Sequence, residues 1–115
     1  MALPRLDETT SDAELAQLFE QARKAGDLLK ALSHETRLLI LCLLTEGEKS
    51  VSELENIMGM PQAAVSQQLA RLRLDSLVNT RRDGRQIYYA IASDEISTII
   101  GQLYDMFCTD VRKKD

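Results

Sequence analysis

The chain is poorly supplied with the residues that most enzymes and metal proteins depend on. Its 115 residues include one histidine, no tryptophan, two cysteines and five glycines. Two cysteines cannot build a disulfide framework, and Cys42 and Cys108 lie too far apart in the sequence to form a CxxC redox or zinc pair. These shortages count against most enzyme classes, and we expect no metal and no cofactor.

Long apolar runs are also missing. The longest, at residues 38–44, is far shorter than the roughly 20 residues that a membrane span needs. The N-terminal residues do not join a basic start to an apolar stretch and a cleavage site, so we expect a cytoplasmic protein without a membrane partner. An apolar content of 44% in a chain of this length is typical of one small globular domain.

The net charge of −4 is unevenly distributed along the chain. Residues 61–91 contain five arginines and two aspartates, which gives +3, and the rest of the chain carries −7. A local basic patch can bind phosphate groups while an acidic remainder discourages nonspecific association. A solvated charged face would explain the same counts, so charge alone does not decide between the two.

Caps and apolar periodicity predict two helices in the first part of the chain. Ser11 and Glu14 form a capping-box pattern at the start of an amphipathic helix that runs to about residue 32. Ser33 can cap a second helix over residues 34–46, which Gly47 would end. Residues 1–10 are expected to be a flexible tail.

A helix-turn-helix is predicted next. Ser52 and Glu55 repeat the capping-box pattern for a helix over residues 53–59, and Pro61 suits the first turn of a helix that ends near residue 74. Two helices joined by so short a connection are typical of this motif. The second helix can expose one polar face, formed by Gln62, Ser66, Gln67 and Arg71.

A hairpin and a last helix complete the pattern. Asp83-Gly84 between two β-prone runs predicts a type I′ turn, and Ile87, Tyr89 and Ile91 alternate with their neighbours as if one face were buried. A helix over residues 94–108 carries a wide apolar stripe. The predicted fold is mainly α with a small β-hairpin: a winged helix-turn-helix domain at residues 11–109, followed by a charged tail at 110–115.

Three stretches, KALSHETRLLIL, SVSELENIMGMPQAAVSQQLARLR and LVNTRRDGRQIYYAI, resemble the ArsR-type bacterial winged-helix repressors in order and separation. The resemblance implies binding to double-stranded operator DNA by a homodimer formed through the first and last helices. The sequence departs from the usual family pattern at Pro61, at Gln67 or Gln68, and at Ser76, where glycine is usual. The expected DNA-binding residues are Gln62, Ala63, Ser66, Gln67, Arg71, Arg82, Gly84 and Arg85.

The two cysteines resemble the sulfide-responsive branch of the same family, with one thiol on the second helix and one at the end of the last. That resemblance implies that persulfide or polysulfide crosslinks Cys42 to Cys108, and that the crosslinked repressor releases its DNA. Reactive sulfur species would then be the inducer. A bridge with extra sulfur atoms would span a gap that is too wide for a direct disulfide.

Alternatives remain open at this point. Both cysteines could be inert core residues, since free cysteine is often buried. A metal-responsive repressor would need zinc ligands, but residues 52–55 offer no thiol and the last helix no histidine. A winged-helix protein-interaction module would keep the fold without DNA binding. A thiol enzyme would need a base beside a cysteine, which the sequence does not indicate.

Overall fold

The computed structural model describes residues 6–108 and 110–111, and the chain divides into two units, Met1–Lys30 and Ala31–Asp115. Most of helix α1 (Asp12–Leu32) belongs to the first unit. Its predicted capping box is present: the Glu14 N–H donates to Ser11 Oγ at 3.1 Å, and the Ser11 N–H donates to a Glu14 carboxylate oxygen at 3.4 Å. Much of the predicted tails, residues 1–5 and 112–115, lies outside the described part of the chain.

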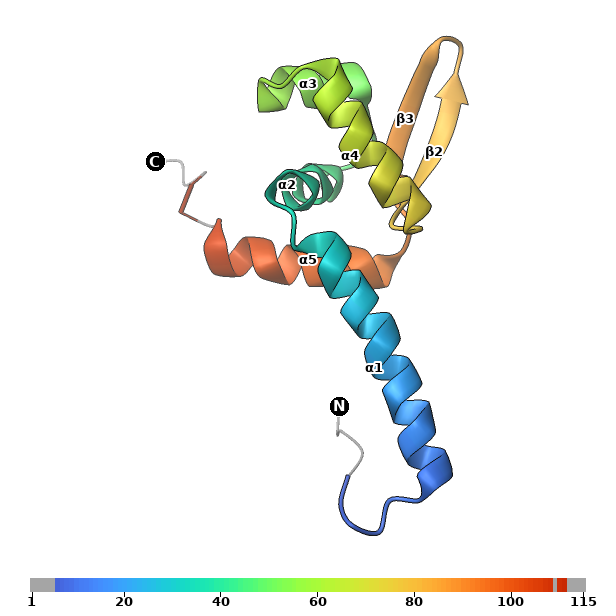
Figure 1. Cartoon of the computed structure of the whole chain (residues 1–115). Helices are drawn as coiled ribbons and strands as arrows, with labels where there is room; N and C mark the ends of the chain where they lie inside the picture. Colours follow the sequence, from blue (N-terminus) through green and yellow to red (C-terminus); the bar gives the residue numbers. More distant parts are fainter. Residues whose placement is uncertain (1–5, 109, 112–115) are drawn as a thin grey trace. The chain divides into compact units, whose positions relative to one another are not determined.

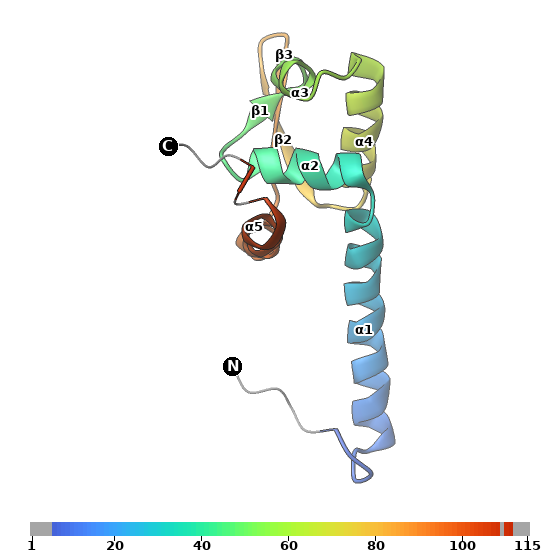
Figure 2. The same cartoon turned by 90° about the vertical axis from the view of Figure 1, so that its left-hand side faces the viewer.

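Helix α2 (Glu35–Leu44) lies at the centre of the second unit, where it packs against both α4 (Gln62–Leu74) and α5 (Asp94–Phe107) (Figures 1 and 2). The apolar run that the sequence places in a buried helix is therefore helical, as predicted. Its buried face joins side chains of the other helices in one core. The largest fully buried side chains are Ile40, Leu41, Leu54, Val65, Leu69, Leu72 and Ile100.

Two predicted helix caps are wrong. The N-cap of α2 is His34, which makes no side-chain cap bond, rather than Ser33. Helix α3 (Val51–Met58) begins two residues before the predicted position, because the capping box pairs Ser50 with Glu53 rather than Ser52 with Glu55. The Ser50 N–H donates to Glu53 Oε1 at 3.0 Å, and the Glu53 N–H donates to Ser50 Oγ at 3.1 Å. Both serine–glutamate pairs have the spacing of a capping box, and the extended backbone at Ser50 makes Ser50 the N-cap.

The helix-turn-helix is confirmed, with two local differences. Gly59 ends α3 in the left-handed region at φ 63°, and Pro61 is the N-cap of α4 rather than a residue of its first turn. Helix α4 ends in a Schellman motif: the Leu77 N–H donates to the Leu72 carbonyl at 2.9 Å, and the Ser76 N–H to the Arg73 carbonyl at 3.0 Å. Ser76 occupies the left-handed position of this motif at φ 61°.

A three-stranded antiparallel sheet contains the predicted hairpin, in the order β1-β3-β2. β2 (Val78–Asp83) and β3 (Gln86–Ile91) form the wing, and the short β1 (Lys49–Ser50) pairs with β3 on its other side. The central turn residues are Gly84 and Arg85. Among described residues other than glycine only Ser76 has a positive φ, so the predicted type I′ turn is wrong and the pattern is that of type II′.

The predicted burial of one face of β3 is also corrected. All its residues from Ile87 to Ile91 are half-buried, without alternation. β3 is the middle strand and packs against α2, α3 and α5, so neither of its faces is fully open or fully covered. After it, Ser93 caps α5 by accepting from the Ile96 N–H at 3.2 Å. Helix α5 buries Ile100 and leaves Met106 and Phe107 exposed.

Candidate DNA interface and dithiol site

The outer face of α4 carries the side chains expected to contact bases. Gln62, Ala63 and Gln67 are exposed and Ser66 is half-buried. Their spacing of three and four residues places them on one side of the helix. Glutamine can donate to and accept from one adenine edge, and serine can bond to several bases. This face is suited to the major groove, which admits an α-helix.

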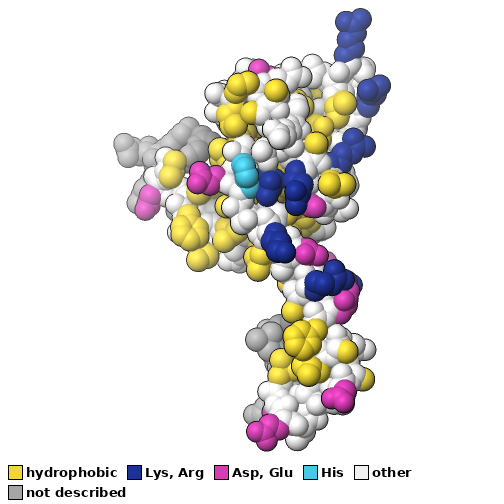
Figure 3. Space-filling model, viewed as in Figure 1, with side chains coloured by type: hydrophobic (Ala, Val, Ile, Leu, Met, Phe, Trp, Pro, Cys, Tyr) yellow, Lys and Arg dark blue, Asp and Glu magenta, His cyan; other side chains and the backbone are white. Residues whose placement is uncertain are grey.

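The tip of the wing offers positive charge. Arg82, Gly84 and Arg85 are all exposed, and Arg85 lies in the turn itself. Figure 3 shows basic side chains at the end of the wing and along the side of the second unit where β2 and α4 lie. Arginines on such a projecting hairpin can reach the phosphate backbone or the minor groove beside a helix in the major groove.

Two other arginines in this region already have acidic partners. Arg71 Nε donates at 3.0 Å to Oδ2 of Asp75, the C-cap of α4, so this predicted DNA-binding residue is held at the end of the helix. Arg81 donates to Glu48 at 3.1 Å through Nε, and its guanidinium lies 4.7 Å from the centre of the Tyr88 ring. The hydrogen bond between Arg81 and Glu48 lowers the pKa of that carboxyl and raises the pKa of the arginine. Arg81, in the middle of β2, therefore links the wing to Glu48.

Cys42 and Cys108 line the same cavity, of about 420 Å³, in the second unit. A second cavity of about 260 Å³ shares both cysteines, Leu39 and Tyr104 with the first, so the two thiols lie on a wall common to both. Cys42 lies in the last turn of α2, and Cys108 follows the last turn of α5, where its N–H donates to the Tyr104 carbonyl at 2.7 Å. Both are free thiols and half-buried.

The two thiols also interact electrostatically. Burial raises the pKa of Cys42 above its ordinary value of 9.0, and the neighbouring Cys108 raises that pKa further. Like charges have this effect only at short range, because each thiolate disfavours the other. A cysteine that attacks first needs a lowered pKa, and Cys42 does not have one.

Neither a metal site nor a membrane span is found in the part of the chain that the structure describes. Within residues 6–108 and 110–111, no group of three or more histidine, cysteine, aspartate or glutamate side chains could hold a metal ion. Among the helices that the structure describes, none combines the length and apolar character of a membrane span.

Comparison with known proteins agrees with this geometry. The family model for bacterial regulatory proteins of the arsR family matches residues 34–80. The biofilm growth-associated repressor of Xylella fastidiosa strain Temecula1 is 38% identical over 107 residues, covering 93% of this chain and 94% of that protein. The chain belongs to the ArsR family.

Other relatives place this ArsR-family protein in the BigR/HlyU subgroup of winged-helix repressors. The HTH-type transcriptional regulator YgaV of Escherichia coli K12 is 44% identical over 96 residues, 83% of this chain and 97% of that protein. The structure of reduced HlyU from Vibrio cholerae N16961 superposes with a TM-score of 0.77 and 41% identity, covering 81% of this chain and 98% of that chain. Such relatives are named as transcriptional regulators and not as enzymes. This protein is accordingly a DNA-binding winged-helix transcriptional regulator of the ArsR family.

Sequence reasoning missed part of the exposed face of α4. Ala70 and Arg73 are both exposed and follow Ser66 at four and seven residues, so they lie on the same side of the helix. Extending the helical spacing beyond Gln67 would have found them. It also missed the partner of Gln68, whose Oε1 accepts from Arg37 on α2 at 3.2 Å. No local pattern signals this contact, because 31 positions separate the two residues.

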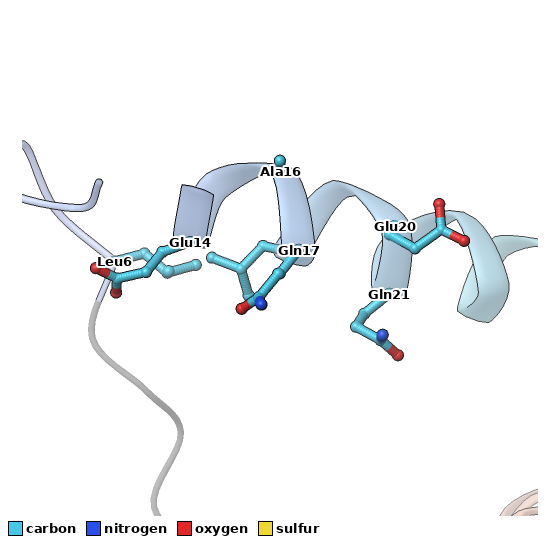
Figure 4. A pocket seen from close by; sticks show the side chains of 7 residues that line it. Leu6, Glu14, Ala16, Gln17, Glu20 and Gln21 are labelled. Atoms are coloured by element: carbon cyan, nitrogen blue, oxygen red, sulfur yellow. The ribbon is translucent and has the colours of Figure 1, made fainter. Parts of the chain in front are cut away.

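A hollow on the first unit offers no comparable site. It is lined by Leu6 and by residues of α1, including Glu14, Gln17 and Gln21 (Figure 4). A single helix supplies almost the entire lining, so no second element encloses a ligand or directs a group toward it. The site residues that remain are those of the second unit.

Proposed function

We propose that this regulator is a homodimeric repressor that binds operator DNA with both thiols reduced and releases it when reactive sulfur bridges Cys42 to Cys108. The observation that carries the proposal is the shared cavity, which brings together two thiols that are 66 positions apart in the sequence. A pair of cysteines in a DNA-binding protein of the reducing cytoplasm is better suited to sensing than to structural support.

The chemistry requires a persulfide or polysulfide as the oxidant. A cysteine thiolate attacks the outer sulfur of RS–SH, the S–S bond of the reagent breaks, RS⁻ leaves and Cys–S–SH forms. The second cysteine thiolate then attacks the inner sulfur of that group, which yields a Cys42–Cys108 disulfide and HS⁻. If both cysteines first take up a sulfur, one attacks the inner sulfur of the other, which yields a trisulfide and HS⁻.

We infer that Cys108 attacks first. Burial raises the pKa of Cys42, so less of this thiol is ionised at neutral pH, and the thiolate is the nucleophile. Cys42 then acts as the resolving thiol, after the first reaction has removed the negative charge of its neighbour. The Cys42→Ser variant should still accumulate a persulfide on Cys108, whereas the Cys108→Ser variant should react more slowly.

The effect on DNA follows from the position of α2. A bridge would join α5 to α2, and α2 packs directly against α4, which carries the base-contacting face. In a dimer the two such helices must be spaced about one DNA turn, ~34 Å, so a small displacement lowers affinity. Allosteric couplings of this kind are typically about 1–3 kcal/mol, which is 5- to 150-fold in binding.

Large apolar side chains that are exposed to solvent support the proposed homodimer. In the second unit, Met106 and Phe107 of α5 are 70% and 74% exposed, and in the first unit Phe19 of α1 is 68% exposed. Clusters of this kind on a small protein mark interaction surfaces. Light scattering coupled to size-exclusion chromatography should give twice the chain mass of 12.9 kDa.

Mass spectrometry tests the sensing step. The reduced protein is treated with an organic persulfide, trapped with an alkylating agent and analysed without reductant. We expect the chain to lose two hydrogens, or to lose two hydrogens and gain one sulfur, with a peptide crosslink between Cys42 and Cys108. Alkylation of both thiols after treatment, with no crosslinked peptide, would contradict the proposal.

One alternative keeps the repressor but makes its cysteines inert. The half-buried state of both thiols, on a cavity wall rather than in the core, favours sensing over this alternative. An inert pair predicts that the Cys42→Ser and Cys108→Ser variants bind and release DNA as the wild type does under every oxidant.

A further inference from the structure

Arg37 of α2 is bonded to two other segments of the second unit. Its Nε donates to the Ala31 carbonyl at 2.8 Å, and its Nη1 donates to Gln68 Oε1 at 3.2 Å. Both contacts are partly buried. The planar guanidinium fork has its donors at fixed angles, so satisfying both acceptors fixes the side chain in one orientation.

Through Gln68, Arg37 contacts α4 on the side opposite to the face that is expected to contact bases. Gln68 is half-buried, while the next residue, Gln67, is exposed on the outer face of α4. A hydrogen bond from a charged donor is stronger than one between two neutral groups. Arg37 therefore restrains rotation of α4 about its axis at the turn that carries a predicted base contact.

We propose that Arg37 is a positioning residue for DNA recognition: it touches no base, and through Gln68 it holds α4 in the orientation that discriminates between sequences. The apolar core holds α4 in the domain, but its side chains are not directional and allow small rotations of the helix. The bond between Arg37 and Gln68 is directional, so its loss should affect recognition more than stability.

The same bond gives a route from the thiols to the DNA. Arg37 and Cys42 lie five residues apart on α2, which is about 7.5 Å along the helix axis. A displacement of α2 imposed at Cys42 would reach α4 through the Arg37–Gln68 bond as well as through apolar contacts. This second part rests on the proposed function.

The test compares specific with nonspecific binding. A duplex is selected from a random-sequence pool with the reduced wild-type protein, and its affinity is measured by fluorescence anisotropy against a shuffled duplex of equal length. Gln68→Met removes only the acceptor on α4 and leaves the Ala31 bond in place. We expect Gln68→Met and Arg37→Met each to lose about tenfold or more in the ratio of specific to nonspecific affinity.

Two readouts separate positioning from other roles. A direct phosphate contact would weaken both duplexes equally and reduce the salt slope of binding by about 0.9. A merely structural role would leave the affinity ratio unchanged at a temperature well below the unfolding midpoint. We expect the salt slope and the nonspecific affinity to stay the same. The double variant should lose no more than Arg37→Met alone, because both substitutions remove the same Arg37–Gln68 bond.

Control variants complete the design. Gln68→Glu keeps an acceptor for Arg37 and should retain most of the affinity ratio. Arg23→Met on α1 removes the same charge from an exposed side chain and should not change it. An unchanged ratio in Gln68→Met and Arg37→Met would overturn the inference. Failure of persulfide to change DNA affinity in the wild type would instead overturn the proposed function and leave the positioning role standing.

Discussion

Replacing Ser76 with glycine should stabilise the protein. Ser76 has φ 61° at the end of α4, and its side chain is exposed. The left-handed region costs an L-residue roughly 1–2 kcal/mol, because its Cβ is too close to the following carbonyl. Glycine avoids this cost but loses more backbone freedom on folding, which opposes the gain by roughly 0.5–1 kcal/mol. The expected net stabilisation is about 0.5–1 kcal/mol, since no packing is lost.

Thermal unfolding followed by circular dichroism measures this effect. A change of that size in a domain of about 100 residues raises the midpoint by about 3–6 °C. The variants must be compared at equal protein concentration, because association makes the midpoint concentration-dependent. Ser76→Ala keeps the Cβ in the left-handed region and should show no increase. A Ser76→Gly midpoint at or below that of the wild type would refute the argument from backbone strain.

Three further changes test other parts of the structure. Ser50→Ala should lower the free energy of unfolding in urea by about 1 kcal/mol, because Ser50 caps α3. Ser52→Ala, which removes no cap, should change it by less than about 0.5 kcal/mol. Equal effects of the two substitutions would contradict the observed cap. Arg85→Ala should lower affinity for all duplexes alike and reduce the salt slope by about 0.9, measured by anisotropy over a salt series; a change in base preference would show instead that Arg85 contacts bases. The alkylation rate of Cys42 should rise with pH to a midpoint above 9, because burial and, to a smaller extent, the neighbouring Cys108 raise the pKa of this thiol. Cys108→Ser should move this midpoint down, because it removes the second cause. A midpoint well below 9 would contradict both causes.

The helices and the wing could be predicted because their signals are local. The apolar run of α2, the glycine after α3 and the Asp-Gly pair of the hairpin each restrict the backbone within a few residues. The structure follows the first two, and it has the predicted hairpin but with a turn of another type. The sequence predicts the ends of helices less accurately where two local patterns compete. The segment before α3 fits a capping box at Ser50 or at Ser52, and only the pairing of β1 with β3 makes the first the cap.

The contacts of the candidate site depend on distant parts of the chain. Nothing near Cys42 indicates that Cys108 lies on the same cavity wall, and only the resemblance to the sulfide-responsive branch paired them before the structure did. The bond between Arg37 and Gln68 has no sequence signature at all. Arg71 matched the predicted exposed face, yet its nearest partner is Asp75, because the sequence pattern does not show which charges are already paired.

A duplex-binding titration tests the central claim most directly. Reduced and persulfide-treated protein are titrated against the selected duplex at one salt concentration, together with Cys42→Ser and Cys108→Ser. The account predicts that persulfide weakens binding by the wild type at least fivefold, that a reductant restores it, and that neither variant responds. Equal affinity of the reduced and treated wild type, with the crosslink confirmed by mass, would contradict it.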